Sequence, residues 1–167
     1  AWTIVDEPGL YRGKCTELCG KNHGFMPIVV KAVEQDEYDL WIKEKKAAAI
    51  AMAELTEKDW SAAELVERGE SLYVTNCVAC HQVNGQGIAG IFPGLVGSDV
   101  VLNDKAGQIE ILMEGIQGAA MNSFSYLSEV EMAAVITYTR QSWGNAEKGD
   151  GEIVVPKDIV EYKQNKI

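Results

Sequence analysis

The pentapeptide CVACH at residues 77–81 constrains this chain more than any other feature of its sequence. In the pattern C-x-x-C-H, Cys77 and Cys80 can each bond to a vinyl group of haem, and His81 can bind the iron. The alternative is a disulfide or a zinc site, but zinc needs more ligands close by. The motif therefore predicts that the residues around it fold against covalently attached haem.

Composition and charge exclude several classes of protein. Apolar residues make up 47% of the 167 residues and charged residues 24%, so the chain can bury a core and is expected to be soluble. The formal net charge of −10 argues against nucleic acid binding, which needs a concentrated basic face. No apolar run approaches the ~18 residues that span a bilayer. The acidic surface suits a basic protein partner or serves solubility alone, and both interpretations stay open.

Changes of pattern divide the chain into four segments. Residues 1–42 contain turn signals and one β-type run at 28–33, too few strands for an independent sheet. Residues 43–60 are charged and then alanine-rich, which predicts a helical linker. Residues 61–145 have mainly helical periodicity. Residues 146–167 are interpreted as an exposed C-terminal extension without a legible function.

Two capping boxes mark the starts of helices in the third segment. Ser61 with Glu64 precedes the helix that leads to the CVACH motif. Ser128 with Glu131 precedes the last helix, which is expected to end at Gly144. The glycine-rich loop between these helices could wrap a flat cofactor closely, because glycine has no side chain to obstruct it.

A second iron ligand is expected from one of the five methionines. A thioether opposite a histidine gives the low-spin iron used in electron transfer, with a raised potential. Met113 and Met132 lie inside predicted helices, where methionine usually fills the core, whereas Met121 lies in a glycine- and alanine-rich loop. Met121 is therefore the predicted ligand. The carbonyl of Pro93 is a candidate partner for the second ring nitrogen of His81, with an ordinary loop proline as the alternative.

Several features together resemble the class I cytochromes c over about residues 65–145. Gly69 lies eight residues and Tyr73 four residues before the first cysteine of CVACH, and Met121 precedes the last helix. The remaining features are the loop sequence FPGL and the closing sequence LSEVEMAAVITYTRQSWGN. The resemblance implies a mainly α fold of helices around haem c, in which the first and last helices cross near Gly69 with Tyr138 close by.

The same resemblance implies roles for individual residues. Cys77 and Cys80 would attach the haem covalently, and His81 and Met121 would be its axial iron ligands. The resemblance also implies electron transfer without chemistry on a substrate. A peroxidase-like haem with an open iron position is the alternative, and it would not need Met121.

A second motif, at residues 15–26, brings soft and borderline metal ligands together. Cys15, Cys19, His23 and Met26 are the donor types that suit copper. The spacing C-x-E-x-C-x-x-x-H-x-x-M, inside PGLYRGKCTELCGKNHGFMPIVV, resembles the dinuclear copper loop of cytochrome c oxidase subunit II. The resemblance implies that both thiolates bridge two copper ions, with His23, Met26 and the backbone carbonyl of Glu17 as further ligands.

The resemblance also implies one more histidine, on an earlier strand of the same cupredoxin-like β domain. The chain has two histidines, and His81 is assigned to haem. Residues 1–42 are therefore expected to be the truncated C-terminal end of that domain, with the copper centre absent or incomplete. Cys15 and Cys19 could then form a disulfide, remain as thiols, or hold zinc or a single copper ion with His23.

The order of copper loop, linker and haem domain resembles bacterial oxidase subunits II that carry a C-terminal cytochrome c domain. It implies that the haem accepts electrons from a donor cytochrome or other redox protein and passes them to the copper pair, while other oxidase subunits reduce oxygen. The oxidase activity would belong to that complex. The alternative is a free electron shuttle or a copper-handling cytochrome.

The resemblance further implies a place in the cell. The complex would face the periplasm at the bacterial inner membrane, held by N-terminal helices that these residues do not include. A homodimer is a further expectation, because the strand at residues 28–33 could pair with the edge of a second copy.

Overall fold

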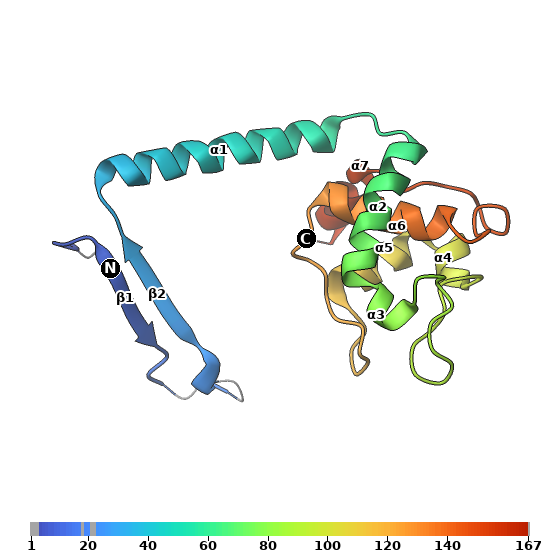
Figure 1. Cartoon of the computed structure of the whole chain (residues 1–167), viewed down its shortest axis with the longest axis horizontal. Coiled ribbons are helices and arrows are strands. Elements are labelled where there is room, and N and C mark those ends of the chain that lie inside the picture. Colours follow the sequence, from blue (N-terminus) through green and yellow to red (C-terminus); the bar gives the residue numbers. More distant parts are fainter. Residues whose placement is uncertain (1–3, 18, 21–22, 167) are drawn as a thin grey trace. The chain divides into compact units, whose positions relative to one another are not determined.

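The computed structural model describes residues 4–17, 19–20 and 23–166. Leu18, Lys21 and Asn22, which belong to the copper-loop sequence, lie outside the described residues. The chain divides into two compact units, Ala1–Met52 and Ala53–Ile167 (Figure 1). The expected fold class agrees with the structure, since the larger unit is helical in its regular secondary structure and the smaller one contains a short antiparallel sheet.

The sheet of the N-terminal unit is a hairpin of two strands, β1 (Gly9–Lys14) and β2 (Pro27–Ala32). They pair antiparallel, with Gly9 opposite Ala32 and Lys14 opposite Pro27. Strand β2 was expected from the sequence, but β1 was not. The two glycines and the charged residues of β1 have low strand propensity. Most residues of both strands are exposed, which fits the end piece of a cupredoxin-like domain.

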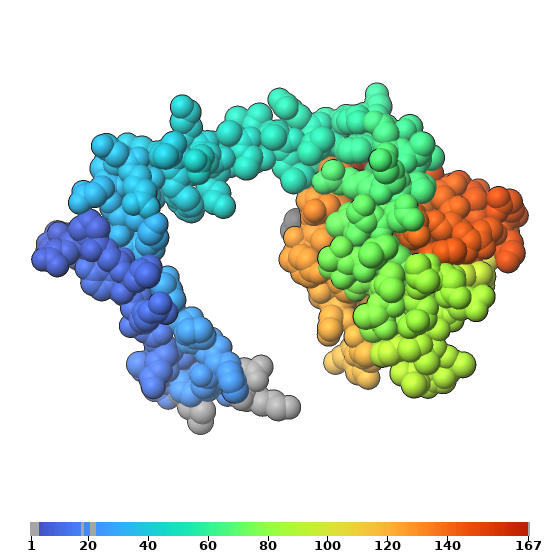
Figure 2. Space-filling view, in the orientation of Figure 1, coloured from blue at the N-terminus to red at the C-terminus, as the bar shows by residue number. Residues whose placement is uncertain are grey.

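Helix α1 (Gln35–Glu57) follows the hairpin and contains the predicted linker helix. It begins before the expected start at residue 43, because no glycine or proline interrupts the sequence and Asp36 and Glu37 favour a helix N-terminus. None of its residues is buried, and Figure 2 shows its side chains exposed along its length. Within the described part of the chain, we found no helix that is both long and apolar enough to cross a bilayer.

The C-terminal unit is built on two long helices, α2 (Ala62–Asn76) and α6 (Glu129–Gln141). Both predicted capping boxes are present at their N-termini. Between these two helices lie three shorter ones: α3 (Val78–His81), α4 (Asp99–Asn103) and α5 (Lys105–Glu114).

Helices α2 and α6 cross at Gly69, as predicted. A Cβ atom on Gly69 would lie 2.1 Å from the carbonyl oxygen of Ala134 and 2.6 Å from the Cβ of Tyr138, so only glycine allows this approach. Beside the crossing, the rings of Tyr73 and Tyr138 pack with their centroids 5.3 Å apart. Trp143 completes this aromatic cluster, with centroid distances of 5.2 and 5.4 Å to the two tyrosines.

The expectation of an exposed C-terminal extension is wrong. The residues after α6 fold back onto it and end in helix α7 (Pro156–Asn165). Val154 and Ile159 are fully buried, and Val154 exchanges two hydrogen bonds with the hydroxyl of Thr137. Proline suits the first turn of a helix, and the carboxylate of Asp158 accepts a hydrogen bond from the N–H of Val155 at 2.8 Å. The polar residues 147–152 conceal this packing in the sequence.

Candidate functional site

A cavity of about 350 Å³ lies inside the C-terminal unit. Its walls come from α2, α4, α5, α6 and the CVACH segment, together with the two loops at residues 82–98 and 115–128. These loops extend from the α3 end of the unit (Figure 1). Most lining side chains are apolar, and no Asp, Glu, Lys or Arg occurs among the described residues that line it. The cavity is therefore suited to a flat, mainly apolar group.

The three reactive residues of CVACH all line this cavity. Cys77 caps the end of α2, and α3 carries Cys80 and His81. The hydroxyl of Tyr73 donates a hydrogen bond of 2.7 Å to the carbonyl of Gln82, which ties the end of α3 back to α2. Burial raises the pKa of the Cys77 thiol to about 11, with a smaller contribution from nearby Cys80. Both sulfurs and the imidazole therefore belong to one cavity.

The imidazole of His81 is held by the loop that follows it. Its Nδ1 lies 3.0 Å from the carbonyl oxygen of Pro93. Because a carbonyl only accepts hydrogen bonds, Nδ1 carries the proton and Nε2 keeps its lone pair for a metal ion. Gly87 allows this arrangement, since a Cβ there would lie 2.5 Å from the Pro93 oxygen. The sequence left the role of Pro93 open, and the structure brings it to His81.

Met121 lies in the loop between α5 and α6 and lines the same cavity as His81. The N–H of Ile116 donates to the Met121 carbonyl at 2.9 Å, which closes a tight turn in this loop. Met113 and Met132 lie in α5 and α6 and do not line the cavity, and Met132 is fully buried in the core. Met121 is therefore the cavity's one methionine among the described residues.

The donor set and the cavity fit haem c. A thioether-linked haem needs two thiols at one edge of an apolar cavity, an imidazole nitrogen and, for six-coordinate iron, a second soft or nitrogen donor. Cys77, Cys80, His81 and Met121 are these groups, and all of them line the cavity. The Tyr126 hydroxyl lies 3.1 Å from the side-chain oxygen of Asn76, which connects the loop of Met121 to the end of α2.

The mouth of the cavity is uncharged. Its exposed lining residues are apolar. They are Ile91, Pro93, Ile116, Ala119 and Ala120. The sequences of both loops, 82–98 and 115–128, contain no acidic or basic residue. The acidic charge of the chain therefore lies outside the segments that surround the mouth.

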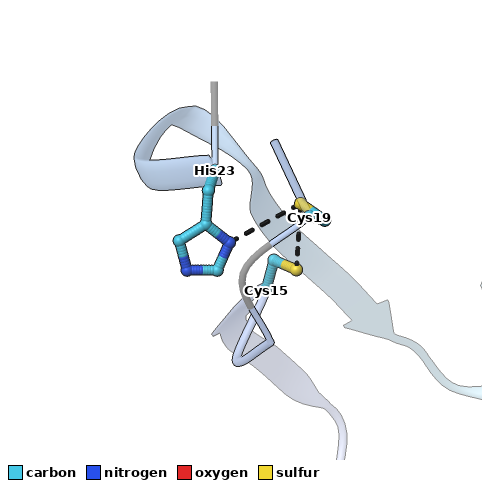
Figure 3. A group of neighbouring side chains, drawn as sticks. All are labelled: Cys15, Cys19 and His23. Carbon is cyan, nitrogen blue, oxygen red and sulfur yellow. Dashed lines mark hydrogen bonds between the residues drawn. The ribbon is translucent and has the colours of Figure 1, made fainter. Parts of the chain in front are cut away.

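The second motif forms a compact cluster in the N-terminal unit. Figure 3 shows the Sγ atoms of Cys15 and Cys19 facing each other at 3.5 Å, with Nδ1 of His23 3.5 Å from the Cys19 sulfur. One ligand atom from each of the three residues lies within 4.8 Å of the others. The Met26 sulfur is 3.1 Å from the Cys19 sulfur, and the Glu17 carbonyl is 3.2 Å from the Cys15 sulfur. All the candidate copper ligands therefore converge.

Strand pairing explains this convergence. Cys15 directly follows β1 and Met26 directly precedes β2, so the antiparallel register places them opposite each other. The N–H of Cys15 donates to the Met26 carbonyl at 3.3 Å. A 3₁₀ turn at His23–Phe25 then directs His23 toward the sulfurs.

Sequence reasoning missed the polar part of the cavity wall. Gln108 and Thr139 are buried, line the cavity, and join through a hydrogen bond of 2.8 Å from Gln108 Nε2 to the Thr139 hydroxyl. Behind them lies Arg140, which is 3% exposed. The sequence offered one signal for this arrangement. Arg140 directly follows the uncharged residues 132–139 of the last predicted helix.

Two known protein families match this chain, one in the N-terminal unit and one in the C-terminal unit. Residues 1–33 match the family described as cytochrome c oxidase subunit II, periplasmic domain, and residues 66–143 match the family described as cytochrome c.

Individual relatives match one or both segments. Cytochrome c oxidase subunit 2 of Alkalihalophilus pseudofirmus is 34% identical over 149 residues, 83% of this chain and 41% of that protein. A probable cytochrome c oxidase subunit 2 of Rickettsia felis is 49% identical over 49 residues, 29% of this chain and 16% of that protein. Cytochrome c-552 of Thermus thermophilus is 37% identical over 97 residues, 50% of this chain and 73% of that protein.

The chain thus spans less than half the length of both subunit 2 relatives, whereas it covers most of the length of cytochrome c-552. Three observations point to the same family: the CVACH motif, the helical domain around the cavity, and the relatives. The chain belongs to the cytochrome c family, and its haem domain is joined to a segment of the periplasmic domain of cytochrome c oxidase subunit II.

Proposed function

We propose that this chain transfers electrons from a donor protein to a copper centre through haem c bound in the cavity of the C-terminal unit. Electron transfer in the context of an oxidase subunit II follows from the family matches. The direction and the two partners are our proposal. The observation that carries it is that Cys77, Cys80, His81 and Met121 all line one apolar cavity.

Each of these residues has a distinct role in the proposal. The thiols of Cys77 and Cys80 would hold haem through one vinyl group each, and Nε2 of His81 and the Met121 sulfur would bind its iron. Bound haem supplies a one-electron couple between ferric and ferrous iron. The hydrogen bond from His81 Nδ1 to the Pro93 carbonyl fixes the ring orientation. The apolar wall excludes water and favours a raised potential.

Replacing Met121 tests the axial ligand. Met121→Ala should lower the midpoint potential of the haem and remove the optical band of the sulfur–iron bond, because a Met/His pair raises the potential. Met113→Ala is the matched control, since Met113 does not line the cavity. An unchanged spectrum and potential in Met121→Ala would contradict the assignment and favour an open iron position of the peroxidase type.

We also propose that the N-terminal cluster binds copper and receives the electrons. Cys15, Cys19, His23 and Met26 present two thiols, an imidazole and a thioether, with the carbonyl of Glu17 in contact. These are soft and borderline donors, which suit copper. The two histidines of the sequence are His23 and His81, so the second histidine of a dinuclear site would come from outside these residues.

Copper titration tests this cluster. The chain should bind copper with a thiolate-to-copper absorption band, and Cys19→Ser should abolish that band because Cys19 contacts three of the other donors. Thr16→Ala, in the same loop, should bind as the parent chain does. Equal binding by Cys19→Ser and the parent chain would exclude the cluster as the copper site.

The remaining expectations concern the cell and the assembly. The family matched by residues 1–33 is described as periplasmic, which supports an extracytoplasmic location and oxidase subunits as partners. Pairing of an edge of the hairpin with a second copy remains a prediction. So do the expected segment boundaries at residues 42, 60 and 145.

A further inference from the structure

Arg140, in the last turn of α6, is a buried charge whose partners come from three parts of the C-terminal unit. Its Nε donates to the carbonyl of Glu152 at 3.0 Å, and Nη1 donates to the carbonyl of Val101 at 2.9 Å. Its Nη2 pairs with the carboxylate of Asp150. A buried charge is costly unless it is paired and hydrogen-bonded, and Arg140 satisfies both conditions.

The guanidinium lies directly behind the cavity wall. Val101, which accepts its hydrogen bond, lines the cavity. Gln108 also lines it, with Oε1 3.5 Å from Nη1 of Arg140. Thr139, the hydrogen-bond partner of Gln108, is a third lining residue. One layer of side chains and backbone therefore separates the charge from the cavity.

The C-terminal segment fixes the opposite charge. The N–H of Asp150 donates to the carbonyl of Leu102 at 3.1 Å, and the Asp150 carboxylate accepts from the N–H of Glu152 at 2.8 Å. Burial acts to raise the pKa of Asp150, but the hydrogen bonds from Arg140 and the Glu152 N–H outweigh it and lower that pKa. Lys105 of α5 acts in the same direction. Asp150 is therefore an anion at neutral pH.

We propose that the Arg140–Asp150 pair sets the reduction potential of the haem, with Arg140 favouring the reduced form and Asp150 opposing it. Reduction adds one negative charge to the haem, so a fixed positive charge nearby stabilises that state, and a fixed negative charge destabilises it. The Arg140 side chain is 2% exposed, so its charge acts through the low dielectric of the interior, whereas the Asp150 side chain is 32% exposed and only partly screened by solvent. The inference rests on the proposed haem site, and it gives the C-terminal segment a role in tuning that site.

Asp150→Asn tests the pair, because it removes one negative charge and keeps the size of the side chain. Arg140 is a poorer target, since its loss removes the ion-pair partner of the Asp150 carboxylate and the side-chain donor to two carbonyls. At a fixed solution potential, the ratio of reduced to oxidised haem should rise by about threefold to tenfold in Asp150→Asn. A tenfold change corresponds to about 59 mV for one electron.

Two control variants distinguish an effect of the Asp150 charge on the reduction potential from an effect of altered structure. Glu152→Gln removes the same charge from the same segment, but the Glu152 side chain is 60% exposed against 32% for Asp150, and it pairs with Lys105 at 3.6 Å. Its ratio should change less than about twofold, because solvent screens an exposed charge. Asp150→Glu keeps the charge and should stay close to the parent chain.

The outcomes distinguish this inference from the proposed function. A parent chain without bound haem overturns the haem site, and the inference with it. If haem binds and Asp150→Asn has the potential of the parent chain, the inference alone is overturned. It is also overturned if Glu152→Gln or Asp150→Glu shifts the potential as much as Asp150→Asn.

Discussion

His81 and Pro93 lie 12 residues apart in the chain, yet the imidazole and the carbonyl oxygen meet at 3.0 Å. Gly87 makes this contact compatible with the loop, because its φ of +66° and its lack of a side chain let the backbone pass close to Pro93. At the scale of single residues, the orientation of the proposed iron ligand therefore depends on a glycine that has no side chain and whose N–H donates to the His81 carbonyl at 2.9 Å.

Gly87→Ala should destabilise the C-terminal unit, because the new Cβ would lie 2.4 Å from the Phe92 oxygen and 2.5 Å from the Pro93 oxygen. Gly90→Ala is the matched control, with a φ of +74° but open space around the added carbon. Gly87→Ala should therefore cost about 1–3 kcal/mol more than Gly90→Ala in free energy of unfolding, measured by denaturant titration. Equal costs would show that backbone conformation alone matters at both positions.

The identity of the reactive residues could be predicted from the sequence, and Pro93 was a candidate partner of His81, but the polar side chains behind the cavity wall could not be predicted. Cys77, Cys80 and His81 are adjacent, and their spacing alone indicates haem. Arg140 and Gln108, by contrast, meet only after α5 and α6 have packed. No local pattern encodes such a contact.

Among the elements, locally encoded helices were predictable and those that depend on packing were not. The capping box of α6 joins Ser128 and Glu131, three residues apart, so it is visible in the sequence. Helix α7 is stabilised by burial of Val154 and Ile159 against distant residues, and its sequence alone suggests an exposed tail. Strand β1 was missed for the same reason, because its pairing with β2 outweighs its weak propensity.

Ser128→Ala should destabilise the unit by about 0.5–2 kcal/mol, because it removes the side-chain acceptor at the N-terminus of α6. Ser71→Ala, at an exposed position within α2, is the control and should have little effect. Chemical denaturation of both variants measures the difference. Equal stability of the two would show that the capping box contributes nothing.

The same capping box predicts a pH dependence. Hydrogen bonds from the Ser128 backbone and hydroxyl lower the pKa of Glu131, although burial opposes them. Because the pKa of Glu131 is lower in the folded chain than its ordinary value of 4.5, this carboxylate stabilises the fold at pH values above 4.5. The stabilisation is lost as the pH falls below 4.5. Ser128→Ala should therefore lose less stability than the parent chain as the pH falls below 4.5. An identical acid dependence in the two proteins would contradict this.

At the scale of the whole molecule, charge is unevenly distributed. The chain has a net charge of −10, but the loops at 82–98 and 115–128 around the cavity mouth carry no acidic or basic residue. The residues that line the mouth therefore present an uncharged surface to a redox partner. Of the two interpretations of the acidic composition, solubility fits this distribution better than steering of a basic partner.

Adding a charge at the mouth tests this distribution. Oxidation of the reduced haem by ferricyanide, a small anion, should depend only weakly on salt above about 0.1 M. Ile91→Glu should slow the reaction severalfold at low salt, because Ile91 lines the mouth and is 70% exposed. Gln164→Glu, exposed on α7, adds the same charge and should have a smaller effect. Equal slowing by the two variants would mean that total charge governs the reaction.

The account depends most on covalent haem at residues 77–81. Mass spectrometry of the denatured holo-chain tests this directly, because thioether bonds survive unfolding whereas an iron–ligand bond does not. The account predicts the mass of the chain plus one haem, with the added mass on the peptide that contains Cys77 and Cys80. Release of haem on denaturation, or its attachment through Cys15 and Cys19, would contradict it.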